Sequence, residues 1–222
     1  MIKAKQKPLA EIRALIAPYQ KILILGCGTC VTISFAGGEK EVGLLASSLR
    51  IAAGMDGLQK TFAEATVQRQ CEWEFIDAVA DQIKRADAVL SLACGIGVQA
   101  LAERYPDKVV LPGVNTTFLG MAIEHGVLVE RCRACGDCVL GLTAGICPIA
   151  RCAKNLLNGP CGGSQKGKCE VDPEMDCAWQ LIYDRLARLG QLDRMEVLQP
   201  PKDWAKDYDG GPRKIVREDL RL

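Results

Sequence analysis

Eight of the twelve cysteines in this 222-residue chain lie between positions 130 and 178, and they restrict its fold more than any other feature. Little apolar periodicity runs through that segment, so it cannot build a large hydrophobic core of its own. We therefore expect bound metal to organise it, because metal binding to thiolates contributes directly to folding free energy. The eight residues are Cys132, Cys135, Cys138, Cys147, Cys152, Cys161, Cys169 and Cys177.

The remaining sequence indicates a reducing compartment and a nearly pure thiolate site. The first twenty residues lack the features of a secretory signal, and no apolar run reaches the roughly 18 residues that span a bilayer. We predict a cytoplasmic protein with no membrane span, in which disulfides are disfavoured. The single histidine, His125, fits a surface or capping role better than a ligand role.

Residues 1–128 predict an α/β domain. Strand-length apolar runs at 21–26, 61–67, 87–93 and 108–114 alternate with helical patterns at 9–20, 39–53, 74–86 and 98–105. This alternation predicts right-handed crossovers and a four-stranded parallel sheet, Rossmann-like or flavodoxin-like, with helices on its faces.

Four more cysteines follow the predicted strands of this domain. Cys27, Cys71 and Cys94 come at or just past three strand ends, and Cys30 lies in the turn after Cys27. The carboxyl ends of parallel strands share one sheet edge, where α/β domains build their sites, so a four-iron site is predicted there. The alternative is that Cys71 and Cys94 are buried as small apolar residues. The segment "GCGTC" lacks the third glycine of a dinucleotide fingerprint, and NAD binding is not expected.

Cys132-x2-Cys135-x2-Cys138 is a three-thiolate run, and the next cysteine, Cys147, precedes a proline. Bacterial ferredoxins use C-x2-C-x2-C-x3-C-P, so the opening and the close match while the interval is longer. By analogy, Cys177 would complete the triplet site. A second site would then take Cys147, Cys152, Cys161 and Cys169.

Zinc is the competing interpretation of each cysteine group, because structural zinc also uses four thiolates in C-x2-C loops. The triplet favours iron-sulfur over zinc, since paired C-x2-C loops suit zinc better. The later group suits both metals. We expect two four-iron clusters. The sheet-edge group could hold a third, and zinc is the alternative at one cysteine group.

The cysteine-rich region is predicted to be a ferredoxin-like iron-sulfur domain over residues 129–194, with helices at 147–157 and 176–190. Residues 195–222, rich in proline, glycine and charge, are predicted to form an extended arm lying on a partner subunit. Balanced charge, 28 basic against 27 acidic residues, gives no surface for nucleic acid and disfavours a cluster-based regulator. No catalytic dyad can be assembled with one histidine.

Two sets of residues resemble a known family. "LLNGPCGGSQKGKCEVDPEMDCAWQLIYDRL" (156–186) is similar to the C-terminal domain of methylenetetrahydrofolate reductases. Four earlier segments resemble the small subunit, of MetV type, of two-subunit bacterial reductases. These segments are "GCGTC", "AGGEKEV", "RQCE" and "LACGIGVQ". The resemblance spans roughly residues 20–190 and is most specific from "NGPCGG" to "CAW".

The resemblance implies a non-catalytic iron-sulfur subunit of anaerobic one-carbon metabolism, as in the reductive acetyl-CoA pathway. Methylenetetrahydrofolate would be reduced on a MetF-type catalytic partner that binds flavin. Electrons would come from a ferredoxin or an associated oxidoreductase subunit. The alternative is a zinc-stapled structural subunit of the same complex with no redox role.

Overall fold

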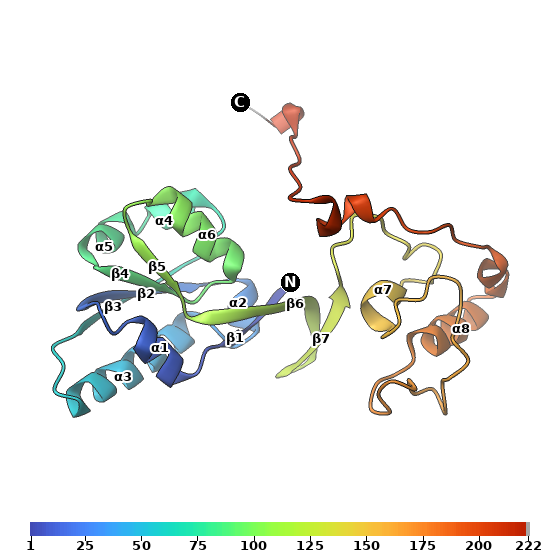
Figure 1. Ribbon diagram of the computed structural model, residues 1–222, viewed down its shortest axis with the longest axis horizontal. Helices are drawn as coiled ribbons and strands as arrows, with labels where there is room; N and C mark the ends of the chain where they lie inside the picture. Colours follow the sequence, from blue (N-terminus) through green and yellow to red (C-terminus); the bar gives the residue numbers. More distant parts are fainter. Residues whose placement is uncertain (221–222) are drawn as a thin grey trace. The chain divides into compact units, whose positions relative to one another are not determined.

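The computed structural model describes residues 1–220 and contains two compact units, Met1–Val129 and Glu130–Leu222. In Figure 1 the first unit runs from blue to yellow-green and the second from yellow to red.

A four-stranded parallel sheet forms the centre of the first unit. Its strands are β2 (Lys21–Cys27), β3 (Thr61–Val67), β4 (Ala88–Ser91) and β5 (Val109–Pro112), in the order β3-β2-β4-β5. The predicted parallel sheet is confirmed. Strand β2 lies in its interior and is buried from Ile22 to Cys27, as expected of a continuous apolar run covered on both faces.

Helices cover both faces of this sheet (Figure 1). On one side, α1 (Leu9–Leu15) and α3 (Glu39–Met55) pack against Ile22 and Ile24 of β2. On the other, α4 (Trp73–Asp77), α5 (Ala80–Arg85) and α6 (Gly95–Arg104) pack against Leu23 and Leu25. The alternation of side chains along β2 thus divides the core into two halves.

Two helices differ from their predicted extents. The helix expected at 9–20 ends at Leu15. Pro18 disfavours helical conformation at Ala17, so the helix cannot continue to residue 20. The helix expected at 74–86 is broken at Val79, where φ is −115°, into α4 and α5. Ile76 and Ile83, on the two sides of the break, are both fully buried.

A second sheet in this unit was not predicted. Strand β1 (Ile2–Gln6) pairs antiparallel with β6 (Val114–Glu124), and β7 (Val127–Cys132) lies on the other side of β6. Gly126, with φ +81°, permits the turn between β6 and β7. These strands escaped prediction because they are only partly buried and lack clear apolar alternation.

The second unit has little regular structure. Its helices are α7 (Pro148–Arg151) and α8 (Ala178–Arg188), followed by 3₁₀ turns at Leu192–Glu196, Trp204–Lys206, Tyr208–Gly210 and Glu218–Leu220. The helix predicted at 147–157 is a single turn, because Cys152 is extended and Asn155 has φ +52°. Within residues 133–220 there is no strand, so a ferredoxin-like fold is not confirmed.

Three side chains of α8 form the small core of this unit. Trp179, Ile182 and Leu186 are buried along one face of the helix, at the spacing that the sequence predicts. The indole Nε1 of Trp179 donates to the carbonyl of Leu156 at 3.0 Å. This contact ties the loop after α7 to α8.

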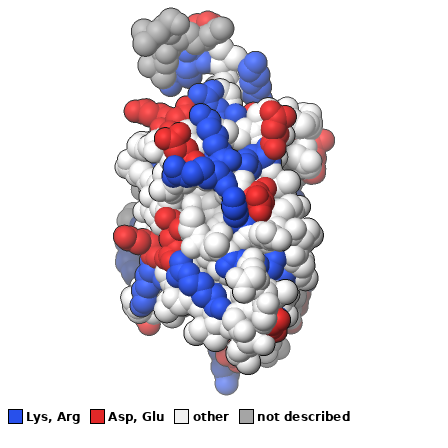
Figure 2. Space-filling view, turned by 90° about the vertical axis from the view of Figure 1, so that its left-hand side faces the viewer, with Lys and Arg blue, Asp and Glu red and all other residues white. Residues whose placement is uncertain are grey.

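Charges of both signs are mixed on the surface. On the face of Figure 2, Lys and Arg side chains lie next to Asp and Glu. Ion pairs such as Arg50–Glu64, at 2.6 Å, and Arg104–Asp77, at 2.5 Å, are typical of the first unit. Among the helices of residues 1–220, none is long and apolar enough to cross a membrane.

Candidate metal centres

Three cysteines lie at the carboxyl edge of the parallel sheet. Cys27 ends β2 and is 7% exposed, Cys94 immediately precedes α6 and is 9% exposed, and Cys71 lies in the exposed loop after β3. Partial desolvation raises the pKa of the Cys71 thiol, and the Cys27 and Cys94 thiols add to the rise. The Cys71 thiol therefore lies within electrostatic reach of the other two.

Gln70 fixes the position of Cys71. Its side chain is fully buried, and its amide nitrogen donates to the carbonyls of Leu25 (2.8 Å) and Gly26 (3.0 Å) at the end of β2. The hydroxyl of Ser91, at the end of β4, donates to the Gln70 amide oxygen at 2.7 Å. A buried amide whose nitrogen and oxygen both have hydrogen-bond partners is costly to move. Gln70 therefore holds its neighbour Cys71 beside the ends of β2 and β4.

Cys27 is fixed through its backbone. Its N–H donates to the carbonyl of Gly37 at 2.9 Å, and its carbonyl accepts from the Thr32 hydroxyl at 2.8 Å. Cys30 is the first residue of α2 (Cys30–Ile33) and is partly buried. The structure thus places Cys27, Cys71 and Cys94 at the same sheet edge, with Cys71 in electrostatic reach of the other two, while no contact of the Cys30 sulfur joins it to them.

The triplet loop, Cys132 to Cys138, turns sharply twice and donates one backbone N–H to a cysteine sulfur. Ala134 and Gly136 have positive φ, +57° and +77°, which turns the chain sharply between the cysteines. The N–H of Ala134 donates to the Cys132 sulfur at 3.3 Å. Hydrogen bonds of this kind favour the thiolate, the form that binds metal.

The same local arrangement recurs at Cys161. Gly162 has φ +82°, and the N–H of Gly163 donates to the Cys161 sulfur at 3.4 Å. This hydrogen bond, with the nearby Lys154 ammonium, lowers the pKa of the Cys161 thiol. The side chain of Glu170 also contacts this sulfur, at 3.6 Å.

The other four cysteines lie around α7 and α8. Cys147 and Cys152 flank the single turn of α7, and Cys177 immediately precedes α8. The N–H of Cys169 donates to the carbonyl of Met175 (2.9 Å), and that of Cys177 donates to the carbonyl of Gly167 (2.8 Å). Cys152 and Cys177 also pack against the α8 core.

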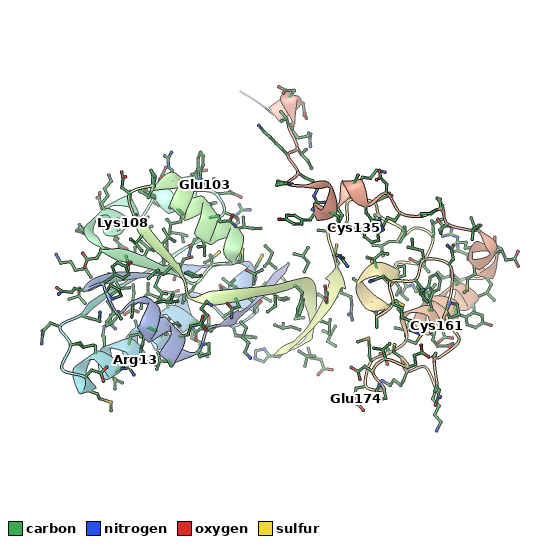
Figure 3. All side chains as sticks on the ribbon, viewed as in Figure 1. Arg13, Glu103, Lys108, Cys135, Cys161 and Glu174 are labelled. Atoms are coloured by element: carbon green, nitrogen blue, oxygen red, sulfur yellow. The ribbon has the colours of Figure 1, made fainter. Side chains whose placement is uncertain are left out.

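No three Cys, His, Asp or Glu side chains within residues 1–220 stand in an arrangement that could already hold a metal ion. Figure 3 shows Cys135 and Cys161 well apart in the second unit, so they do not share one site as the loops stand. The division of the eight later cysteines into two sites stays a prediction. Metal binding at the triplet would require the loop to bring its sulfurs together.

Two observations fit an anionic metal–thiolate group in this chain. The amide-to-sulfur hydrogen bonds at Cys132 and Cys161 stabilise negative sulfur. In the first unit, Lys3 is fully buried on β1, and its ammonium has no hydrogen-bond partner among the described residues. Strand β1 contacts α2, the helix that begins at Cys30. A buried cation on the strand that packs against this helix is suited to balance a negatively charged group bound there.

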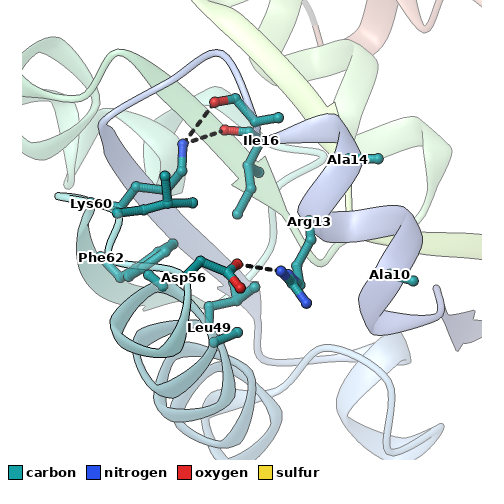
Figure 4. Close-up of a pocket in the computed structure, with 12 residues that line it drawn as sticks. Ala10, Arg13, Ala14, Ile16, Leu49, Asp56, Lys60 and Phe62 are labelled. Atoms are coloured by element: carbon teal, nitrogen blue, oxygen red, sulfur yellow. Dashed lines mark hydrogen bonds and ion pairs between the residues drawn. The ribbon is translucent and has the colours of Figure 1, made fainter.

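A separate hollow of about 490 Å³ lies between α1 and α3. Figure 4 shows Arg13 paired with Asp56 across it, and Lys60 donating to main-chain carbonyls, with distances of 3.1 Å to Ile16 and 2.8 Å to Ala17. No cysteine lines this hollow, and these charged groups already have partners within the chain. It is therefore not part of the candidate metal centres.

Alkylation of the metal-free chain is expected to distinguish two exposed thiols. Cys161 should react with iodoacetamide faster than Cys71 near neutral pH, because the pKa of Cys161 is lowered and that of Cys71 is raised, and only the thiolate attacks. Mass spectrometry of the two peptides at increasing pH measures both rates. Equal rates, or a faster Cys71, would contradict the hydrogen-bond arrangement at Cys161.

Sequence reasoning missed the residues that position the cysteines. Gln70 and Ser91 were not singled out, although a serine inside the apolar run "DAVLSLA" is a signal that a buried polar partner exists. Lys3 was also missed. Its burial depends on the unpredicted β1–β6 pairing, so no local pattern indicates it.

Comparison with known proteins finds a family match for part of the chain. Residues 111–205 match the family model described as methylene-tetrahydrofolate reductase C terminal. The matched region includes all eight later cysteines, α7, α8 and the start of the arm, and the resemblance to this family is confirmed there. No curated protein and no solved structure matches the chain.

Proposed function

We propose that this chain is an iron-sulfur electron-transfer subunit of a methylenetetrahydrofolate reductase complex. It would take electrons from a ferredoxin or a partner oxidoreductase subunit and deliver them to the flavin of a MetF-type catalytic subunit. The observation that carries the proposal is the family match over residues 111–205, which covers the cysteine triplet and its amide-to-sulfur hydrogen bond.

Three cysteine groups would hold the clusters. The first group consists of Cys132, Cys135, Cys138 and Cys177. The second consists of Cys147, Cys152, Cys161 and Cys169. The third lies at the sheet edge and consists of Cys27, Cys30, Cys71 and Cys94. A four-iron cluster, when bound, supplies one-electron chemistry, with a potential tuned by hydrogen bonds to its sulfurs and by nearby charge. The chain's own contribution is to hold the thiolates and donate backbone N–H groups to them.

Metal analysis of the full chain purified without oxygen tests this proposal. About eight irons per chain are expected for two clusters and about twelve for three, with EPR signals after dithionite reduction. Stoichiometric zinc without such signals would support the structural alternative and contradict electron transfer. Addition of the reduced chain to a MetF-type subunit should then reduce its flavin.

Single cysteine replacements test the ligand groups. Cys135→Ser, Cys161→Ser and Cys94→Ser each remove one thiolate from a different group, so each should lower iron content by about four per chain where that group holds a cluster. Ser164→Ala, close to Cys161 in sequence but with no thiol, is the matched control and should retain all iron. Full iron in a cysteine variant would exclude that residue as a ligand.

A further inference from the structure

The C-terminal arm contacts the triplet loop of its own chain. Lys202 has a side chain only 2% exposed, and its ammonium donates to the Asp137 carbonyl and lies 3.9 Å from the Asp137 carboxylate. Lys206 places a second ammonium 3.7 Å from the same carboxylate. A buried lysine with a main-chain carbonyl as partner is a specific contact, in contrast to an exposed ion pair.

Arg213 makes the second main-chain contact. Its guanidinium donates to the carbonyl of Ala134 at 2.9 Å and to that of Lys206, in the arm itself, also at 2.9 Å. At Gly136 the arm comes so close that a Cβ would lie 2.4 Å from the Lys206 carbonyl oxygen. Any other residue at 136 would push the arm away, and its positive φ also favours glycine.

Arg133 completes the set of contacts. Its Nε lies 3.8 Å from a carboxylate oxygen of Asp207, which is 5% exposed, and its guanidinium lies over the ring of Trp204 at 5.8 Å. All four residues between the three cysteines are therefore contacted by the arm. Figure 3 shows Cys135 beside the short helical turns of this segment.

We infer that residues 202–213 of the arm are a positioning element for the Cys132–Cys138 thiols, with Lys202 and Arg213 as its principal residues. A trans peptide is planar, so a fixed carbonyl also fixes the following N–H on the opposite side. Holding the carbonyls of Ala134 and Asp137 thus directs the N–H groups of Cys135 and Cys138 away from the arm. The role of the thiols in redox chemistry rests on the proposed function, whereas the positioning itself does not.

The positive charges of the arm also affect the electrostatic potential at the triplet loop. The arm brings three positive charges to this loop, on Lys202, Lys206 and Arg213. The three cysteines of the loop are negative when they are thiolates. Positive charge near a metal–thiolate group stabilises its reduced form, which carries more negative charge, and so raises its reduction potential. Loss of Lys202 should therefore lower that potential.

Hydrogen exchange on the full metal-free chain tests the positioning. Lys202→Met keeps the length of the side chain but removes the donor, and Arg213→Met removes the second contact. Each should speed amide exchange in the peptide covering residues 132–138 by about 10- to 100-fold, the effect of losing a charge-assisted hydrogen bond. Lys214→Met, at an exposed neighbour of Arg213, is the control and should leave exchange unchanged.

Unchanged exchange in both variants would overturn the inference, whatever metal the chain binds. Absence of iron from the wild-type chain would instead overturn the proposed function, and exchange would still decide whether the arm positions the loop. In the iron-loaded chain, an EPR-monitored redox titration should show one signal shifted to lower potential by Lys202→Met and restored by Lys202→Arg. No shift in any signal would contradict the role of the arm in tuning the site.

Discussion

Replacing Gly37 with alanine is expected to destabilise the α/β unit by about 2–4 kcal/mol. A Cβ at this position would lie 1.9 Å from the carbonyl oxygen of Leu92 and 2.8 Å from the Leu92 Cβ. Leu92 is fully buried just past β4, so neither partner can move away cheaply. The strain would also reach Cys27, whose N–H is bound by the Gly37 carbonyl.

Gly54 offers a matched control for this substitution. It lies within α3, and nothing stands within 4 Å of a Cβ added there, so Gly54→Ala should stabilise the chain by up to about 1 kcal/mol through helix propensity. Urea unfolding followed by circular dichroism measures both variants in the metal-free chain. If the Gly37→Ala chain were as stable as the wild type, Gly37 would not approach Leu92 as closely as the structure shows.

The parallel sheet could be predicted because its determinants are local. Apolar runs of strand length alternate with helical stripes. Cys27 ends β2 and Cys94 comes shortly after β4, so their place at one edge follows from the topology. The break in the helix at Val79 could not be predicted in this way. A helical stripe shows which residues face the core but not whether the backbone is continuous between them.

The arm shows how long-range contacts escape sequence analysis. Its proline, glycine and charge content predicted a segment lying on a partner subunit. Within the chain, the structure places Lys202 against Asp137, 65 residues earlier. The burial of Lys202 could not be inferred, because lysine is normally exposed and its partner is a main-chain carbonyl. The expected contact with a partner subunit stays a prediction.

Replacing Lys3 with methionine is expected to stabilise the metal-free chain by about 1–3 kcal/mol. Its ammonium is fully buried and has no hydrogen-bond partner among the described residues, so folding loses the hydration of this group without recovering it. Methionine has a similar length and no polar group at its end. Lys5→Met, at an exposed position of the same strand, is the control and should change stability by less than about 0.5 kcal/mol.

Metal loading should reverse the sign of this effect. Strand β1 contacts α2, which carries Cys30, so we expect a cluster that includes Cys30 to place negative charge on the helix that packs against the strand of Lys3. Removing one partner of a buried charge pair is destabilising, and Lys3→Met should then lose iron faster than wild type under a chelator. Urea unfolding of both forms, with iron release in parallel, measures the reversal. If Lys3→Met destabilised the metal-free chain by more than about 1 kcal/mol, the ammonium would already have a partner in the protein. That result would contradict the proposal that Lys3 balances the charge of a cluster on the edge cysteines.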